Sequence, residues 1–582
     1  MYHFKDAKPL DTVKKIKNIL TDIGIEVEHY EIYSGIGDLH SYRVEIKGTK
    51  GVYGTNGKGI NKEYALASAY AEFLERVQNN LLFSAIRDDS YTEYGFYYSI
   101  DEREFDIKDL AELEEKFLSN IIAELNESSS VLEHLKSWSF LYPNKGRIIT
   151  FPFKEYSSGV VHYIPIHIVK IYMGSNGMCS GNSKAEALVQ GISELFERYA
   201  MKRILSERLT MPKIPESEYS SFAEFYDLVK DFRCKSGFEL NFYDASLGEG
   251  LPVVAAIGID KKQKKYHVHF GAHPVFEIAL ERSVTEMMQG QRLSEPNNFM
   301  DFDIENGLNA SSMSNRVQMY INGIAYAPLE FFKAVPSYAY KKFESINSMS
   351  NEHILDFLLN KVKGYGWGIL YRDTSFSGFN SYHVHVDCMS IHKYDDATIK
   401  LPELFGLHNK LFVPIRRIAD ADGRQLRLIL NLLKKFEKYN IRKRYRPLTN
   451  SFLELNNTYG VADISVFIVF ILLKLGRFRQ VQSYLNKLNA PKNTAMAVLK
   501  EYLLGLDSGY SHKDLVEVLG LFYENDIIDL LERVNSGEAL SLLPNINCFE
   551  CDNCLCRESC VYKLTKICRD KYFLYLLNKS EV

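Results

Sequence analysis

The chain has 582 residues, a formal net charge of -4 at pH 7 and 46% hydrophobic residues, an ordinary globular composition that predicts two or three domains. No basic face dominates, so we expect no general binding to DNA or to a membrane. The first residues lack a basic-then-apolar signal pattern. The longest apolar run, 466–473, is far short of the roughly 20 residues that a transmembrane helix needs, so we expect a cytoplasmic protein.

The first 420 residues alternate between helical and strand-like segments. Helical periodicity predicts helices at 11–23, 62–79 and 183–205, and one more around 279–286. Alternating or continuous apolar runs predict strands at 42–46, 161–172, 251–259, 266–270, 368–372 and 382–386. Because several of these strands form hairpin-like pairs between helices, the order favours an α+β fold with mixed sheets and helices over a doubly wound sheet.

From about Gly423 onward the sequence is almost wholly helical. Segments 465–475 and 481–488, joined at Gly476, predict a helical hairpin, and further helical patterns cover 495–504 and 515–533. No clean repeat period is visible, but stacked helical pairs of the tetratricopeptide kind are the expected arrangement. Such stacks usually present a surface to another protein, so we expect a homodimer or another protein partner.

These patterns divide the chain into three parts. Residues 1–420 form the α+β domain, 421–545 an all-α tetratricopeptide-like region and 546–582 a cysteine-rich tail. The tail holds six of the nine cysteines. In a cytosolic chain such close spacing indicates a metal site more readily than disulfides. The best four ligands for zinc or an Fe–S cluster are Cys548, Cys551, Cys554 and Cys560. The alternative is a reduced or redox-labile tail.

Carboxylates recur at one spacing in the predicted helices. Residues three or four apart share one face of a helix, so two helices each carry a pair of glutamates on one face, and a third carries Arg282 four residues before a glutamate. Glutamates among apolar neighbours need a cation or hydrogen-bond partners, because burying an unpaired charge is costly. A single copy could be a solvated helix face, but the repetition favours a site. The five glutamates are Glu72, Glu75, Glu194, Glu197 and Glu286.

Glycine-rich segments precede two of these helices. They are 55–59, which reads TNGKG, and 175–182, which reads SNGMCSGN. A glycine-rich turn that opens a helix can offer backbone N–H groups and a positive dipole end to phosphate. Neither segment matches the P-loop or the dinucleotide-binding pattern. The combination predicts a nucleotide and Mg²⁺ site of neither the Walker nor the Rossmann type.

The run 175–182, followed by Glu186, Gln190 and the Glu-x-x-Glu-Arg motif at 194–198, resembles the signature of the YcaO superfamily. Segments 57–76 and 270–286 are similar to the family's first and third ATP-site helices. The resemblance covers residues 1 to about 420 and continues more loosely through the helical region. It implies a YcaO-type domain that binds ATP and Mg²⁺ without a Walker motif.

The resemblance also implies roles for individual residues. Mg²⁺ usually takes one or two carboxylates per ion, so the five glutamates suit two or more ions. An arginine next to a site glutamate points about 100° away around the helix, so we expect one of Arg76 and Arg198 to be structural. No catalytic residue is identified. The residues implied for ATP are Lys5, Thr12, Arg76, Asn182, Glu186, Gln190, Arg198 and Arg282.

Three functions are consistent with the resemblance. The layout resembles stand-alone bacterial members that serve as accessory factors for methylthiolation of a small-subunit ribosomal protein, with a methylthiotransferase as partner and ATP hydrolysis. The second is ATP-dependent activation of a backbone amide in a peptide substrate, as in cyclodehydratases and thioamide-forming enzymes. Azoline-forming members tend to end in a proline-rich tail, and this chain has no proline after Pro544. The third is a nucleotide-gated binding module without its own chemistry.

Overall fold

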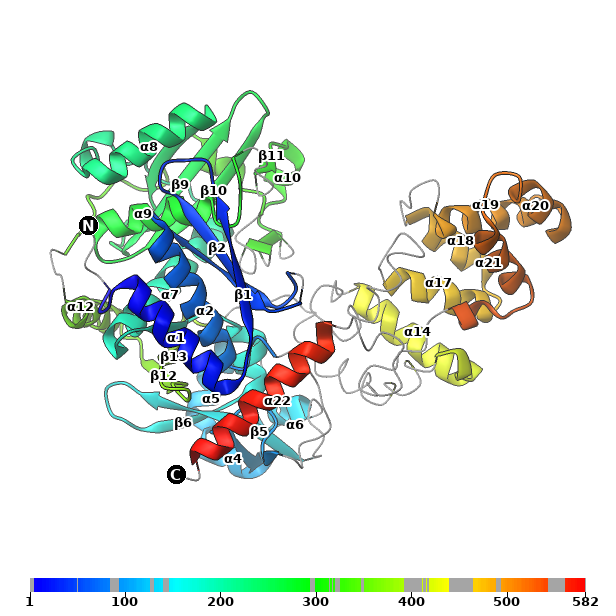
Figure 1. Cartoon of the computed structure of the whole chain (residues 1–582), viewed down its shortest axis with the longest axis horizontal. Coiled ribbons are helices and arrows are strands. Elements are labelled where there is room, and N and C mark those ends of the chain that lie inside the picture. The colour runs from blue at the N-terminus through cyan, green and yellow to red at the C-terminus, as the bar shows by residue number, and fades with distance from the viewer. Residues whose placement is uncertain are drawn as a thin grey trace. The chain divides into compact units, whose positions relative to one another are not determined.

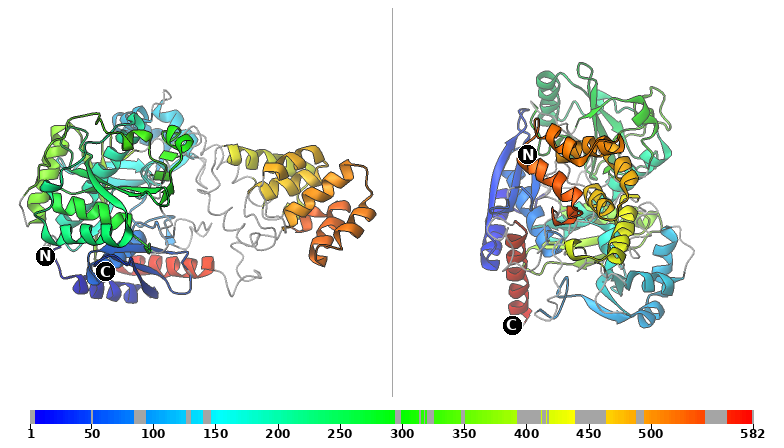
Figure 2. Two further views of the ribbon diagram at one scale, coloured as in Figure 1. Left: turned by 90° about the horizontal axis from the view of Figure 1, so that it is seen from above. Right: turned by 90° about the vertical axis from the view of Figure 1, so that its right-hand side faces the viewer.

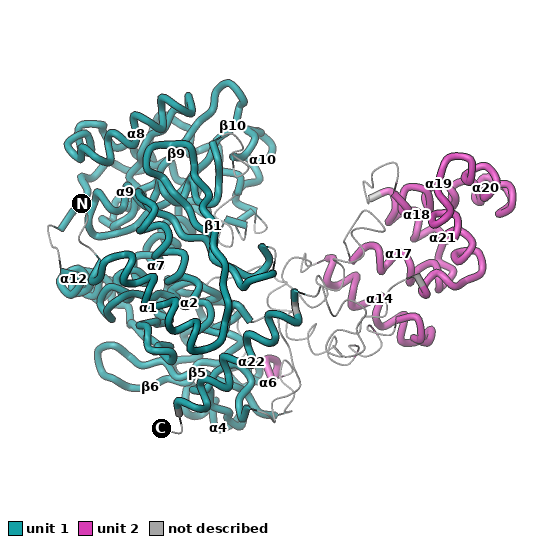
Figure 3. The backbone as a smooth tube through the Cα atoms, in the orientation of Figure 1, with its two compact units in different colours: residues 1–135, 146–395, 561–582 teal, residues 136–145, 396–560 magenta. Residues whose placement is uncertain are grey.

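In the computed structural model the chain divides into two compact units (Figure 3). Unit 1 comprises residues 1–135, 146–395 and 561–582, and unit 2 comprises 136–145 and 396–560. The structure describes residues 5–49, 51–83, 94–125, 130–139, 146–293, 299–312, 315–316, 318–319, 325–346, 350–391, 411, 415, 418–438, 464–487, 494–542 and 561–580.

The described residues of unit 1 form three sheets, and every strand pairing in them is antiparallel (Figure 1). The first has the order β1 (Val27–Tyr33), β2 (His40–Ile46), β3 (Gly54–Gly59). The second has the order β11 (Met300–Asp301), β10 (Lys265–Ala272), β9 (Val253–Asp260), β8 (Glu239–Asp244). The third has the order β4 (Arg103–Asp106), β5 (Arg147–Glu155), β12 (Ile369–Asp373), β13 (Asn380–Val386), β7 (Met178–Gly181), with β6 (Val161–Pro165) paired to β5.

Helices cover these sheets. The long ones are α1 (Pro9–Ile23), α2 (Lys62–Gln78), α7 (Lys184–Glu207), α8 (Ala223–Ser236), α9 (Phe276–Met287), α12 (Asn351–Gly364) and α22 (Val561–Ser580). The shorter ones are α4 (Ile107–Leu113), α5 (Glu115–Glu124) and α10 (Ile304–Leu308), with single turns at Glu216–Glu218 and Leu329–Phe332. Helix α6 (Val131–Ser139) begins in unit 1, and its residues from 136 onward are assigned to unit 2. The mixture of helices with antiparallel sheets confirms the predicted α+β class.

Helix α7 is the central element of unit 1. It contacts β7 and β13 of the third sheet, β9 and β10 of the second sheet, and α12. Apolar residues are therefore buried around most of its circumference, among them Ala187, Leu188 and Val189. Helix α2 covers the first sheet and also contacts β7, while α9 covers the second sheet and also contacts β3. These contacts hold the three glutamate-bearing helices next to one another.

Each of these helices lies directly against a strand at a glycine. A Cβ on Gly57 of β3 would lie 2.0 Å from a backbone nitrogen of α2, and one on Gly271 of β10 would lie 2.4 Å from a backbone oxygen of α9. A Cβ on Gly181 of β7 would lie 2.8 Å from a backbone nitrogen of α7. Any larger residue would push strand and helix apart, so these glycines set how closely the site helices approach the sheets.

The prediction of glycine-rich turns before the site helices is wrong in part. Residues 54–59 and 178–181 are strands, and their glycines serve packing instead. The helix starts are closed by side chains, since Asn61 accepts the N–H of Tyr64 and Ser183 accepts that of Glu186. One free N–H at each start is thereby satisfied without phosphate.

Replacing Gly57 by alanine should lower the free energy of unfolding by about 2 kcal/mol, because overpacking forces the backbones of β3 and α2 apart. The matched control is Gly364→Ala in α12, where an added Cβ meets nothing within 4 Å. The control change should leave the free energy of unfolding unchanged or raise it slightly. Chemical denaturation of both variants measures the difference, and equal stabilities would contradict the close approach.

Most predicted elements agree with the structure to within a few residues, but two do not. The predicted strand 161–172 ends at Pro165 and is followed by a helical turn, Ile168–Met173, because proline has no N–H for further strand pairing. The predicted helical segment 515–533 is two helices, α20 (His512–Leu519) and α21 (Asn525–Asn535), separated at Gly520.

Helix α22 lies in the predicted cysteine-rich tail but packs on α1 in unit 1 (Figures 1 and 2). Tyr572 and Phe573 are buried, and the Phe573 ring lies edge-on to Phe96 at 4.8 Å. The Lys571 ammonium donates to the carbonyl of Gly24 at 2.8 Å. The four proposed metal ligands, Cys548, Cys551, Cys554 and Cys560, lie outside the described residues.

Unit 2 is helical wherever the structure describes it. Its helices are α14 (Gly423–Lys438), α17 (Ile464–Lys474), α18 (Phe478–Lys487), α19 (Ala495–Asp507), α20 and α21, with single turns at Ile418–Asp420 and Ala539–Leu542. Sequence neighbours pack on one another, and α17 and α18 form the predicted hairpin around Gly476. A tetratricopeptide assignment stays a prediction. Across the described part of the chain, no helix has both the length and the apolar character to cross a membrane.

Candidate nucleotide and magnesium site

The start of α7 is tied to the N-terminal segment through the buried carboxylate of Glu186. Lys5 Nζ lies 3.2 Å from Glu186 Oε1, and the backbone N–H of Asp6 donates to Oε2 at 2.9 Å. The Asn182 side-chain amide donates to the same carboxylate, and Thr12 Oγ1 donates to Asn182 Oδ1 at 2.8 Å. Burial alone raises the pKa of Glu186, but Lys5 and these donors outweigh it and hold that pKa below its usual value.

One turn further along α7, Gln190 meets an arginine from α9. The Arg282 guanidinium donates to the side-chain oxygen of Gln190, and also to the carbonyl of Ala272 at 2.9 Å. Its orientation is therefore held from both the α7 side and the end of β10. Four of the residues predicted for ATP therefore lie near the first turns of α7, and they are Asn182, Glu186, Gln190 and Arg282.

Further along, four of the predicted glutamates lie near Lys58, namely Glu72, Glu194, Glu197 and Glu286. The fifth, Glu75, lies near Arg76, Glu72 and Glu194. The Lys58 ammonium contacts Glu286 directly, and the strongest charge effects on it come from Glu72 and Glu197. Burial lowers the pKa of Lys58 to about 8 despite these carboxylates. Sequence reasoning missed Lys58 as a site residue. Lys58 lies between Gly57 and Gly59 in the segment predicted as a glycine-rich turn, so no helix or strand periodicity marked it in the sequence.

Two of the glutamates are deeply buried. Glu75 is 6% exposed and Glu197 is 8% exposed. Burial raises the pKa of Glu75 to about 8, because the nearby carboxylates of Glu72 and Glu194 add to it and only Arg76 strongly opposes it. Burial likewise raises the pKa of Glu197. Both glutamates therefore lie where negative charge is poorly compensated in the protein alone.

The arginines beside the glutamates are paired to different degrees. Arg76 lies 2.9 Å from Glu75 and 3.4 Å from Glu72, so its guanidinium bridges both carboxylates of α2. Arg198 is less tightly held, at 3.8 Å from Glu194. This difference favours Arg76 as the structural arginine of the two.

The donor set fits a magnesium–nucleotide complex better than a preformed metal cage. In the part of the chain that the structure describes, no three His, Cys, Asp or Glu side chains are arranged to hold a metal ion by themselves. Mg²⁺ keeps water and phosphate ligands and needs few carboxylates, so a looser cluster suits it. A divalent cation would supply the positive charge that Glu75 and Glu197 lack. Phosphate oxygens could then pair with Lys58 and Arg282.

A family model described as YcaO cyclodehydratase, ATP- and Mg²⁺-binding, matches residues 56–390, a region that includes all three site helices. The chain belongs to the YcaO family. This confirms the resemblance drawn from the sequence.

Two curated relatives are similar to this YcaO protein. The ribosomal protein S12 methylthiotransferase accessory factor YcaO of Escherichia coli is 31% identical over 293 residues, which is 50% of each chain. An uncharacterized protein of Haemophilus influenzae is 29% identical over 355 residues, which is 60% of this chain and 59% of that protein. The chain thus spans about half to three-fifths of the length of the relatives that it matches.

Solved structures of the same kind are more distant. A heterocyclase in complex with substrate and cofactor is 19% identical with a TM-score of 0.47, covering 67% of this chain and 53% of that one. YcaO from Methanopyrus kandleri, bound with AMPPCP and Mg²⁺, is 16% identical with a TM-score of 0.43, covering 68% and 94% of the two chains.

The raised pKa of Glu75 predicts a pH dependence in protein free of metal and nucleotide. The Glu75 carboxyl has a pKa of about 4.5 in the unfolded chain and about 8 in the folded chain. Its contribution to the free energy of unfolding is therefore complete below pH 4.5 and is lost as the pH rises to about 8. The loss is at most about 1.4 kcal/mol per pH unit. Denaturation of the parent and of Glu75→Gln with chelator present, from pH 5 to 9, should show the variant gaining relative stability with pH. If the free energies of unfolding of the two proteins change with pH in the same way, the raised pKa of Glu75 is wrong.

Proposed function

We propose that this chain binds ATP with Mg²⁺ at the glutamate cluster and acts as an accessory factor for methylthiolation of a small-subunit ribosomal protein, with cleavage of ATP. The observation that carries the proposal is the gathering of five glutamates from three helices around Lys58 and the arginines. The similarity to the Escherichia coli accessory factor supports the biological role.

In this proposal, residues near the start of α7 bind the nucleoside, and residues further along the helix bind the phosphates and Mg²⁺. The nucleoside end is held by Lys5, Thr12, Asn182, Glu186 and Gln190. Lys5 offsets the charge of the Glu186 carboxylate, and the other three residues supply neutral donors and acceptors. Lys58 and Arg282 bind phosphate oxygens, and Arg76 and Arg198 pair with the glutamates nearby. The five glutamates hold Mg²⁺ directly or through water. When bound, Mg²⁺ neutralises the phosphates and stabilises charge that develops during phosphoryl transfer.

A second candidate is ATP-dependent activation of a peptide backbone amide. The family description, YcaO cyclodehydratase, favours it. A third is a nucleotide-gated binding module, in which unit 2 recruits a methylthiotransferase or a second copy of the chain as a homodimer.

Turnover by the purified full-length chain separates these functions. We expect Mg²⁺-dependent release of phosphate or pyrophosphate from ATP, increased by the ribosomal protein together with its methylthiotransferase. Mass change of a peptide supplied alone would favour the second candidate. Tight ATP binding without any turnover, with or without partners, would overturn the proposal in favour of the binding module.

We also propose a zinc or Fe–S site at Cys548, Cys551, Cys554 and Cys560. Four thiolates within a short segment can bind one ion or cluster compactly. Elemental analysis of protein purified without chelator should find about one zinc per chain, or iron with sulfide. Changing Cys551 and Cys554 to serine should remove the metal, whereas Cys234→Ser, an exposed cysteine of unit 1, should retain it. Metal-free parent protein with freely titrating tail thiols would exclude the site.

A further inference from the structure

Helix α20 of unit 2 and the turn that follows it carry three apolar side chains on one side. Helix α20 packs on α19 and α21 (Figure 1). The N–H groups of Phe522 and Tyr523 both donate to the carbonyl of Leu519, so helical turns continue past the end of the helix. Val518 lies three and four residues before Leu521 and Phe522, and the three side chains therefore share one side of these turns. We call these three side chains the apolar patch.

The apolar patch is open to solvent. Val518 is 52% exposed, Leu521 is 77% exposed and Phe522 is 75% exposed. The next side chain, Tyr523, holds this turn against α19, because its hydroxyl donates to Glu501 Oε2 at 3.1 Å. Single exposed apolar residues are normal on a protein surface, but three on one turn indicate a surface that another molecule covers.

Uncompensated negative charge borders the apolar patch. The segment 514–526 contains four carboxylates and no lysine, arginine or histidine. Nearby carboxylates outside this segment have partners, since Asp529 lies 2.9 Å from Arg533 and Glu532 lies 2.9 Å from His512. In the described part of unit 2, no ion pair involves the four carboxylates within the segment. They are Asp514, Glu517, Glu524 and Asp526.

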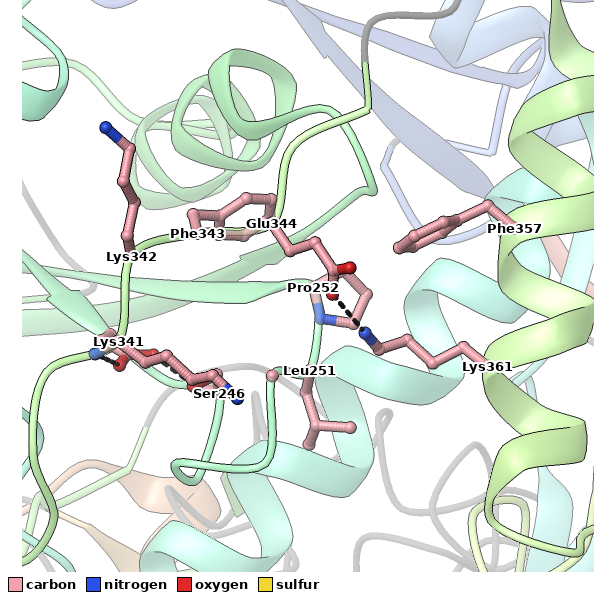
Figure 4. A pocket seen from close by; sticks show the side chains of 11 residues that line it. Ser246, Leu251, Pro252, Lys341, Lys342, Phe343, Glu344, Phe357 and Lys361 are labelled. Carbon is pink, nitrogen blue, oxygen red and sulfur yellow. Dashed lines mark hydrogen bonds and ion pairs between the residues drawn. The ribbon is translucent and has the colours of Figure 1, made fainter.

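The charged groups around the small cavity of unit 1 are arranged differently (Figure 4). That cavity is lined by carboxylates and lysines together, and Lys361 lies 3.4 Å from Glu344. Lys342, which also lines it, lies 3.1 Å from Glu218. These charges compensate one another within the chain. The carboxylates beside the apolar patch are instead available to a cation from another molecule.

We propose that the apolar patch and the carboxylates beside it dock a basic segment of a protein partner that also carries apolar side chains. The apolar side chains of the partner cover Leu521 and Phe522, and its lysines or arginines pair with Glu517 and Glu524. Burial of the apolar side chains supplies most of the affinity. The opposite charges favour basic partners over acidic ones and speed their encounter with the chain.

Other occupants fit this surface less well. A second copy of the chain would bring the carboxylates of both copies together, and like charges repel. Nucleic acids and anionic lipid surfaces are repelled for the same reason. A ribosomal protein binds RNA through lysine and arginine, so the substrate in the proposed function has the required charge. The identity of the partner as that substrate rests on the proposed function.

Two fluorescein-labelled helical peptides and the full-length chain test the docking surface without nucleotide. One peptide has leucines on one face and lysines on the other, and the second has glutamate at each lysine position. Fluorescence anisotropy should show binding of the lysine peptide, weakened by salt, and no binding of the glutamate peptide. Carbodiimide joins an amine to a nearby carboxylate, so cross-links from the lysine peptide, located by mass spectrometry, should fall on Glu517 or Glu524.

Replacing both Leu521 and Phe522 by serine should weaken binding of the lysine peptide by at least about tenfold, because two apolar contacts are lost. The variant should keep the thermal stability of the parent, since both side chains lie on the surface. The matched control is Val335→Ser in unit 1, where the side chain is 79% exposed. The control should bind the peptide like the parent.

Changing both Glu517 and Glu524 to glutamine should also weaken binding and reduce its dependence on salt. Glu344→Gln, which changes an exposed carboxylate of unit 1, is the matched control and should have no effect. Equal binding of the two peptides, cross-links confined to other carboxylates, or unchanged affinity in both double variants would overturn the proposal.

A second copy of the chain as the occupant gives a different result. Light scattering would then show self-association of the parent that is lost when Leu521 and Phe522 are replaced by serine, and this outcome would also overturn the proposal. None of these measurements requires ATP. Absence of ATP turnover would therefore count against the proposed function alone, and failure of peptide binding would count against the docking surface alone.

Discussion

Replacing Glu75 or Glu197 by glutamine is expected to abolish Mg²⁺-dependent ATP binding, a loss of at least about 100-fold in affinity. Each change removes a carboxylate that is available to Mg²⁺ and keeps the side-chain volume. The fold should survive, because both side chains are buried and their pKa values are raised, so a neutral amide suits the folded chain at least as well. Isothermal titration calorimetry with Mg-ATP measures the loss.

Glu63→Gln is the matched control for Glu75→Gln. Glu63 is an exposed glutamate in the first turn of the same helix, α2, and it is outside the cluster. The control variant should bind Mg-ATP like the parent. If Glu75→Gln and Glu197→Gln also bind like the parent, the assignment of the cluster to Mg²⁺ and ATP is wrong.

Deleting residues 561–582 should destabilise unit 1, although these residues lie far beyond the family region in sequence. Helix α22 buries Tyr572, Phe573 and Leu576 in unit 1. Even Phe573→Ala alone should cost about 3 kcal/mol, since it loses buried area and leaves a cavity. Thermal denaturation of the full-length variant measures this cost. The matched control is Leu574→Ala, an exposed residue on the same helix, with an expected change within about 0.5 kcal/mol.

The helical region can be removed separately if α22 is kept. Replacing residues 421–545 by a flexible Gly/Ser linker should leave Mg-ATP binding intact, because the glutamate cluster and α22 both belong to unit 1. Self-association or capture of a partner should be lost. Light scattering and nucleotide titration check both points. An unchanged oligomeric state together with unchanged partner capture would show that unit 2 is a passive addition.

The helices that carry the site could be predicted from sequence because their evidence is local. The spacing of Glu72 with Glu75, and of Glu194 with Glu197, places each pair on one face whatever the rest of the fold does. An apolar setting around a carboxylate is also visible in the chain itself. The α+β class followed in the same way from the alternation of strand pairs and helices.

Only the tertiary structure decided how these helices come together and what completes the cluster. Lys58 becomes a site residue because β3 packs against α2 and also contacts α9. The glycines before the helices allow close packing of strands, which local patterns cannot distinguish from phosphate-binding turns. Helix α22 joins unit 1 through contacts with α1 at the other end of the chain. The local sequence determined which residues share a face, because side-chain periodicity depends on nearby backbone geometry. Long-range packing determined which faces meet, because burial depends on the whole fold.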